Sequence, residues 1–112
     1  EDSATTRKVI SITLGRHGYR VAEAADGVEA LSRISEERPD LILLDVVLPQ
    51  MDGYELLAIL KKNKKFKEIP VVLLTSKDGF LNRVRGRLAG AAAYLTKPFD
   101  PDRMIAEIEK HL

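Results

Sequence analysis

The sequence predicts an α/β fold in which helices cover both faces of a parallel sheet. Residues 41–44 and 71–74 are short apolar runs with apolar side chains on both sides of the backbone, as in strands buried on both faces. Segments with helical spacing separate these runs. Alternating strands and helices with short connections give parallel strands joined by right-handed crossovers. The predicted class is therefore a doubly wound sheet in one domain.

Two further strands are expected, and both have weaker signals. Residues 92–95 form a short, mostly apolar run, and residues 20–24 are more polar, as in an edge strand. Helices are expected between the strands. The apolar positions at helical spacing are Val9 with Ile12, Ile10 with Leu14, Leu31 with Ile34, Leu56 with Leu60, and Ile105 with Ile108 and Leu112.

Turn and cap residues divide the chain at the same places. Asp26 and Gly27 mark a turn before the second helix, and Asp100 followed by Pro101 is typical of a helix N-cap with proline at the first helical position. Two charged segments are also visible. Arg83 and Arg87 share a helical face with Arg85 turned away from it, and residues 61–67 carry five lysines, which are most simply a solvated helix end.

Composition excludes several classes of function. The chain of 112 residues fits one domain, and its 18 basic and 17 acidic residues leave a net charge of +1. This balance argues against nucleic acid as a direct partner, because phosphate-backbone binding needs a basic excess. The lack of cysteine excludes thiol nucleophiles and a disulfide scaffold. With no apolar run near the ~20 residues of a membrane span and no signal-peptide pattern, we expect a cytoplasmic protein without a membrane partner.

Polar side chains follow the predicted strands at the points where the strands end. Asp45 and Thr75 come directly after the two apolar runs, and Lys97 lies just beyond the run at residues 92–95. Because the functional crevice of a parallel α/β sheet lies at the carboxyl ends of its strands, we expect these side chains to lie close together. Glu1 and Asp2 would reach the same edge if a strand preceded them.

This set of side chains suits phosphoryl transfer. Carboxylates bind a hard cation such as Mg²⁺, and a cation together with a lysine offsets charge on a transferring phosphoryl group. A threonine hydroxyl can donate a hydrogen bond to a phosphoryl oxygen, and one carboxylate can be the nucleophile that forms an acyl phosphate. Taken alone, each residue also has an ordinary explanation, with Asp45 as a loop acid or helix cap and Lys97 as a solvated lysine.

Four elements resemble those of response-regulator receiver domains, in the family's order and at its spacing. The stretch DVVLPQMDG that begins at Asp45 is similar to the phosphoacceptor strand end and the loop after it. Thr75-Ser76 resembles the switch threonine and its small neighbour, Lys97-Pro98-Phe99 the lysine–proline element, and Glu1-Asp2-Ser3 the acidic pair that ends the first strand. A narrower similarity, over residues 76–90 and 94–99, is to receivers of type IV pilus twitching motility and related chemosensory systems.

The resemblance implies a flavodoxin-like sheet of strand order 2-1-3-4-5 and a role for each matching residue. Asp45 would accept the phosphoryl group, Lys97 would pair with that group, and Thr75 would move to hydrogen-bond it. Tyr94 would change between outward and inward rotamers as the loop after Thr75 closes. The peptide bond before Pro98 would be cis, which an X–Pro bond allows at modest cost.

The resemblance also implies a Mg²⁺ site. Asp2, Asp45 and the backbone carbonyl of Val47 would ligate the ion, and Glu1 would contribute through water. Val47 and Lys77 stand at positions whose side chains tune the phosphoryl lifetime in this family, so the rate of dephosphorylation is open.

The implied function is a phosphoacceptor switch of a two-component system, not an enzyme with a separate substrate. Its only chemistry would be Mg²⁺-dependent self-phosphorylation and autodephosphorylation. A sensor histidine kinase would donate the phosphoryl group, and the face of the fourth helix, fifth strand and fifth helix would then bind an output protein or domain, or a second receiver in a homodimer. Two alternatives stay open: a degenerate receiver that acts as a scaffold, and a haloacid-dehalogenase-like phosphatase, which needs a second acid where this chain has Val47.

Residues 1–112 are expected to form a receiver domain that lacks its N-terminal strand. In the 2-1-3-4-5 order that strand is internal, so its absence would leave the neighbouring strands with unpaired backbone groups. We therefore expect that apolar residues precede Glu1 in the native chain, or that a neighbouring molecule supplies the strand.

Overall fold

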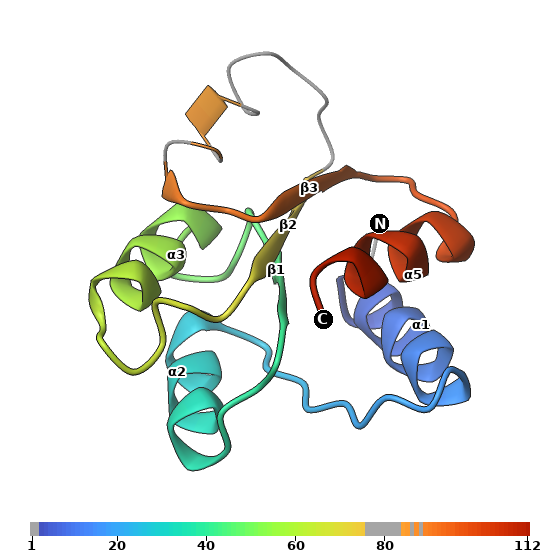
Figure 1. Ribbon diagram of the computed structural model, residues 1–112, viewed down its shortest axis with the longest axis horizontal. Coiled ribbons are helices and arrows are strands. Elements are labelled where there is room, and N and C mark those ends of the chain that lie inside the picture. Colours follow the sequence, from blue (N-terminus) through green and yellow to red (C-terminus); the bar gives the residue numbers. More distant parts are fainter. Residues whose placement is uncertain (1–2, 76–83, 86, 88) are drawn as a thin grey trace.

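A three-stranded parallel sheet lies at the centre of the computed structural model, which describes residues 3–75, 84, 85, 87 and 89–112 (Figure 1). The strands follow one another in the order β1 (Ile42–Asp45), β2 (Val71–Thr75) and β3 (Ala93–Thr96). The register places Asp45 opposite Leu74, and Thr75 opposite Thr96. The carboxyl ends of all three strands therefore meet at one edge of the sheet, as the sequence predicts.

Helices cover both faces of the sheet (Figure 1). One pair lies on one face and one pair on the other: α2 (Gly27–Glu36) with α3 (Gly53–Lys62), and α1 (Ser3–Arg16) with α5 (Pro101–Lys110). Residues 84, 85, 87 and 89 are helical as well. The remainder of the expected fourth helix lies outside the described residues.

The continuous apolar strands supply two separate cores, because alternate side chains of a strand point to opposite faces. On one face, Val71 and Leu73 of β2 pack with Leu56, Leu57 and Leu60 of α3. On the other face, the buried cluster contains Val72 and Leu74 of β2, Leu95 of β3, Leu14 of α1, and Met104, Ile105 and Ile108 of α5. Successive side chains of β2 thus belong alternately to the two cores, which confirms the doubly wound arrangement.

An aspartate caps each of the three helices that follow a turn. The side chains of Asp26, Asp52 and Asp100 accept a hydrogen bond from the backbone N–H three residues later, at 2.8, 2.8 and 2.9 Å. These bonds satisfy N–H groups that have no partner within the helix. Pro101 occupies the first turn of α5, so the cap predicted there is confirmed.

The strand predicted at residues 20–24 is absent, since the structure has no regular secondary structure at that segment. A strand needs a neighbour with which to exchange backbone hydrogen bonds. Within the described part of the chain, β1 pairs only with β2, and its other edge faces residues 20–24 across a gap instead of a strand. The prediction was wrong because it judged the segment by its composition without a pairing partner.

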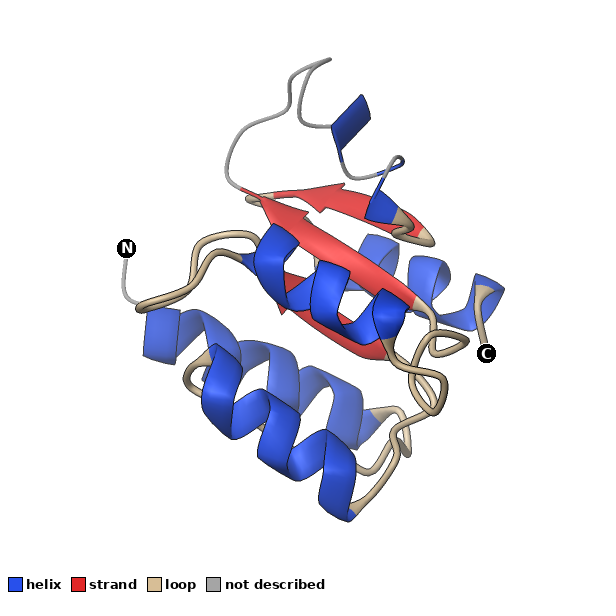
Figure 2. Ribbon diagram, turned by 90° about the vertical axis from the view of Figure 1, so that its left-hand side faces the viewer, coloured by secondary structure: helices blue, strands red, loops and turns tan. Residues whose placement is uncertain are grey.

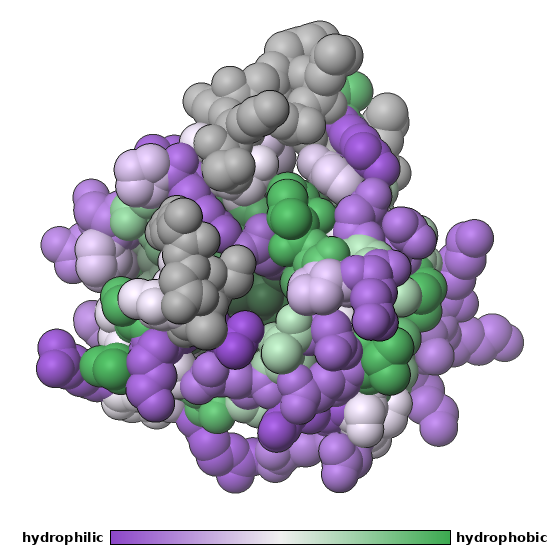
Figure 3. Space-filling view, turned by 180° about the vertical axis from the view of Figure 1, so that it is seen from behind, coloured by the Kyte–Doolittle hydropathy of each residue, from purple (hydrophilic) through white to green (hydrophobic). Residues whose placement is uncertain are grey.

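An open cavity of about 1340 Å³ occupies this gap. Residues 19–26 and residues 41–45, which include β1, line this cavity, and Ile10 and Leu14 of α1 are also part of the wall. Figure 2 shows that α1 begins near the end of the sheet where the strands end. Seen from behind, the surface is mostly hydrophilic, with hydrophobic residues around a central hollow (Figure 3). We call this cavity, which lies between residues 19–26 and β1, the slot beside β1.

Candidate functional site

Asp45 and Lys97 form the centre of the site at the carboxyl edge of the sheet. The Lys97 Nζ lies 2.5 Å from Asp45 Oδ2, and the side chains are 15 and 26% exposed, respectively. The other carboxylate oxygen, Oδ1, accepts a hydrogen bond of 3.1 Å from the backbone N–H of Val47. Both oxygens of Asp45 are thus oriented by neighbours, while the side chain stays partly open to solvent.

The end of β2 positions Lys97. Its backbone N–H donates to the carbonyl of Thr75 at 2.5 Å, one step beyond the pairing of Thr75 with Thr96. Thr75 is the one buried polar residue recorded among the described positions, at 4% exposure. The peptide bond between Lys97 and Pro98 is cis. The structure therefore brings Asp45, Thr75 and Lys97 to the same edge, each at or just after the end of a different strand.

The loop after Asp45 is packed tightly against the start of α3. The backbone N–H of Gly53 donates to the carbonyl of Val46 at 2.8 Å. A Cβ at Gly53 would overlap the carbonyl oxygen of Asp45 and would lie 2.7 Å from the Val46 Cα, so only glycine fits. Val47 is 73% exposed beside the carboxylate and leaves that side of Asp45 accessible. The peptide that carries Asp45 is thus fixed by α3, whereas its side chain faces solvent.

Tyr94 lies half-buried on β3 and packs against the core of the α3 face, which includes Tyr54. Burial raises the pKa of the Tyr54 phenol, and the nearby Arg85 guanidinium lowers it in part. The Arg85 Cζ stands 4.0 Å from the centroid of the Tyr54 ring. The sequence did not predict this contact, because the two residues belong to different elements and neither is part of the strand-end pattern.

Comparison with known proteins identifies the family. The profile of the response regulator receiver domain matches residues 1–109. The chain is a receiver domain. Protein PilG of Pseudomonas aeruginosa is 38% identical to it over 112 residues, which are 100% of this chain and 83% of that protein. This similarity agrees with the narrower resemblance to receivers of pilus and chemosensory systems.

Other relatives are similar over nearly the whole of this chain. The phosphate regulon transcriptional regulatory protein PhoB of Escherichia coli is 39% identical over 109 residues, 97% of this chain and 48% of that protein. The receiver domain thus spans about half the length of such regulators. The crystal structure of chemotaxis protein CheY4 of Vibrio cholerae has a TM-score of 0.93 and 34% identity, and the match covers 100% of this chain and 93% of that chain.

Membership places the receiver in a family of signalling switches of two-component systems. Such domains generally depend on Mg²⁺, and in general they interact with histidine kinases and output domains. Within the described ranges, none of the helices has the length and hydropathy that a membrane crossing needs.

The described residues at this edge of the sheet include oxygen atoms of the kind that bind hard cations. The Asp45 carboxylate and the Val47 carbonyl are the oxygen donors that a hard cation prefers, and they are adjacent in the loop. Among the residues that the structure describes, no cluster of three or more acids or histidines is close enough to hold a metal. Glu1 and Asp2, the other expected ligands, lie outside the described residues.

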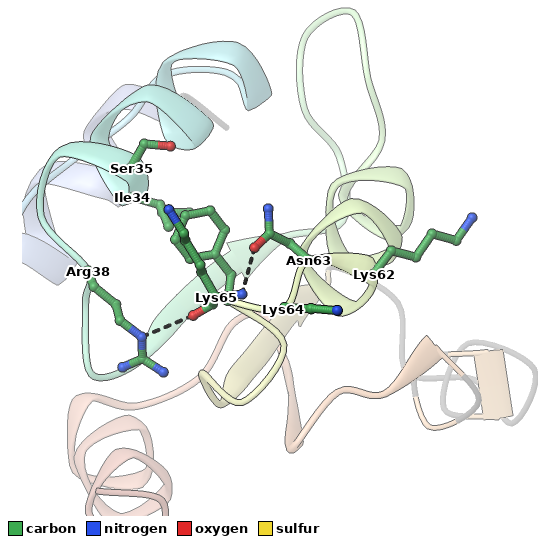
Figure 4. Close-up of a pocket in the computed structure, with 8 residues that line it drawn as sticks. Ile34, Ser35, Arg38, Lys62, Asn63, Lys64 and Lys65 are labelled. Atoms are coloured by element: carbon green, nitrogen blue, oxygen red, sulfur yellow. Dashed lines mark hydrogen bonds between the residues drawn. The ribbon is translucent and has the colours of Figure 1, made fainter.

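A second hollow in the receiver, of about 840 Å³, lies at the opposite edge of the sheet, where α2 and α3 end (Figure 4). Basic side chains in and beside this hollow bind backbone carbonyl groups. Arg38 Nε donates to the carbonyl of Lys65 at 3.2 Å, and Lys61 Nζ donates to the carbonyl of Lys67 at 2.9 Å. These cations stabilise carbonyl groups at and after the helix ends, where the helix dipole favours positive charge. We therefore assign this hollow no role in the chemistry at Asp45.

Proposed function

We propose that Asp45 is the phosphoacceptor of this receiver. An oxygen of its carboxylate attacks the phosphorus of a phosphohistidine on a sensor kinase, or of a small acyl phosphate such as acetyl phosphate. The bond from phosphorus to the leaving histidine nitrogen or acetate oxygen breaks, and an acyl phosphate forms on Asp45. The observation that carries the proposal is the Lys97–Asp45 contact of 2.5 Å at a solvent-accessible edge of the sheet.

Each neighbour of Asp45 has a defined task in this reaction. The Lys97 ammonium offsets the negative charge of the incoming phosphoryl group and forms an ion pair with that group once it is attached to Asp45. The hydroxyl of Thr75, at the end of the adjacent strand, donates a hydrogen bond to a phosphoryl oxygen. The backbone N–H of Val47 keeps one carboxylate oxygen oriented while the other attacks.

The oxygen donors of Asp45 and the Val47 carbonyl, completed by Asp2 and by Glu1 through water, would hold Mg²⁺. When bound, the ion would stabilise the negative charge on the phosphoryl oxygens. The carboxylate and carbonyl chemistry of this set fits that ion, which takes oxygen ligands and keeps several waters.

The added charge at Asp45 then biases a two-state element. Thr75 and Lys97 are drawn toward the phosphoryl group, and Tyr94 changes rotamer as the loop after Thr75 closes. The face formed by the fourth helical segment, β3 and α5 binds an output protein or domain, or a second receiver, more tightly in one state than in the other. A domain served by an ATP-dependent kinase belongs in the cytoplasm.

We further propose that the receiver is completed by an apolar strand in the slot beside β1. Three features support this: the edge of β1 that faces away from β2, the cavity between that edge and residues 20–24, and the start of α1 at the carboxyl edge. A parallel strand of about five residues that led directly into α1 would pair with β1.

Fusing a short β-branched apolar segment ahead of Glu1 should raise the free energy of unfolding, and a proline-containing segment of equal length should not. Equal stabilities would contradict the completion.

Intact mass spectrometry after incubation with acetyl phosphate and Mg²⁺ tests the chemistry. We expect a phosphoryl adduct on the parent protein and none on Asp45→Asn, which keeps the shape of the side chain. Asp40→Asn is the matched control, because Asp40 is an exposed aspartate shortly before the start of the same strand. Chelation of Mg²⁺ should abolish the adduct. An adduct of equal yield on Asp45→Asn would overturn the assignment.

A further inference from the structure

Arg85 joins two parts of the receiver that are distant in the sequence. Its Cζ lies 4.0 Å from the centroid of the Tyr54 ring, and its Nη2 lies 3.6 Å from Asp52 Oδ2. The other carboxylate oxygen of Asp52 accepts the backbone N–H of Glu55 at 2.8 Å and caps α3. Tyr54 as a whole residue is only 8% exposed. The guanidinium is therefore held by two groups that α3 itself has already oriented.

The start of α3 is in turn attached to the peptide of Asp45. Gly53 donates its N–H to the Val46 carbonyl at 2.8 Å and packs so closely on the Asp45 carbonyl oxygen that a Cβ would not fit. A shift of the Asp45 peptide must therefore move Gly53, and with it the neighbouring Asp52. A short series of contacts thus runs from the phosphoacceptor to Arg85.

We propose that Arg85 is a coupling residue that transmits the state of Asp45 to the helical segment of residues 84, 85, 87 and 89. The inference rests on the proposed phosphorylation of Asp45 and adds a route through the start of α3 to the one through Thr75. Arginine suits the task because its planar guanidinium stacks on an aromatic ring and pairs with a carboxylate at the same time. A lysine is a compact point charge and does not combine the two contacts in the same way.

Hydrogen exchange of the backbone amides of Val84, Arg85, Arg87 and Ala89 tests the coupling, with and without acetyl phosphate and Mg²⁺. In Arg85→Gln without acetyl phosphate, the exchange rate of these amides should rise about fivefold, because one exposed cation–π contact is lost. The phosphoryl adduct should still form, as intact mass on the same samples shows. Its formation should change exchange in this segment much less than in the parent. Arg87→Gln, an exposed arginine on the same segment, should behave like the parent.

Two substitutions on α3 separate coupling from general loosening. Asp52→Asn keeps a good N-cap but removes the charge, and Tyr54→Leu removes the ring. Each should reproduce the exchange of Arg85→Gln, and combining either with Arg85→Gln should add little.

Tyrosine-ring carbon NMR gives an independent readout. Because the Arg85 cation lowers the pKa of Tyr54, Arg85→Gln should raise that pKa further and Arg87→Gln should not. If Arg85→Gln carries the adduct and its segment responds to phosphorylation as in the parent, the coupling role is wrong. If the parent itself forms no adduct, the proposed function fails first.

Discussion

Replacing Gly53 by alanine tests the packing of α3 on the phosphoacceptor peptide. In an ordinary helical position, glycine to alanine stabilises a protein by about 0.5–1 kcal/mol. Here the new Cβ would overlap the Asp45 carbonyl oxygen and lie 2.7 Å from the Val46 Cα, and both are backbone atoms that cannot rotate aside. Overpacking costs about 1–3 kcal/mol, and weakening the Gly53–Val46 hydrogen bond adds about 1 kcal/mol. We expect a net loss of about 2–3 kcal/mol, or roughly 10 °C in Tm.

Gly15→Ala is the matched control for this substitution. Gly15 lies in α1, and a Cβ there would meet nothing within 4 Å. Its replacement should leave stability unchanged or raise it by about 0.5 kcal/mol. Urea and thermal unfolding followed by circular dichroism measure both variants. If Gly53→Ala is as stable as the parent, α3 is not locked against the Asp45 peptide, and the route from Asp45 to Arg85 loses its first step.

Three further predictions concern the core, a helix cap and pH. Leu73→Ala removes a fully buried side chain from the central strand and should lower the free energy of unfolding, measured in urea, by about 2–5 kcal/mol. Ile59→Ala, at a side chain 42% exposed, should lower it far less. Equal losses would contradict the assigned core. Asp52→Ala removes the helix cap and should lower the free energy of unfolding by about 1 kcal/mol, whereas Asp52→Asn should lower it by only a small part of that. If Asp52→Asn were the less stable variant in the same assay, capping would not be what Asp52 contributes. Burial raises the pKa of Tyr54 above 10.0, so the folded state keeps the phenol proton to higher pH than the unfolded state. The stability from Tyr54 is therefore fully present below pH 10 and is lost as the pH rises through the folded pKa. Unfolding curves above pH 10 should show a steeper loss for the parent than for Tyr54→Phe, and parallel losses would refute the shift.

The strands that could be predicted from sequence are those whose apolar side chains point to both faces. The apolar runs at residues 41–44 and 71–74 became β1 and β2 with ends shifted by one residue at most. Their composition alone requires burial on both sides. Residues 20–24 have no such composition, and whether they form a strand depends on a neighbour that local patterning does not contain.

The centre of the site was predictable for a related reason. Parallel strands bring the residues after their carboxyl ends together, so Asp45, Thr75 and Lys97 could be grouped from the sequence alone. The orientation of Arg85 could not be predicted in this way. Its partners Tyr54 and Asp52 are determined by how two helical segments pack. Arg83, which was expected on another face than Arg85, lies outside the described residues.

Locating the phosphoryl group on the chain is the most direct test of whether Asp45 is the phosphoacceptor. After incubation with acetyl phosphate and Mg²⁺, borohydride reduction converts an aspartyl phosphate to homoserine, which peptide sequencing by mass spectrometry can find. We predict homoserine at position 45 alone. Homoserine at another aspartate, or a stable phosphoryl group that borohydride does not remove, would contradict the assignment of Asp45 as the phosphoacceptor.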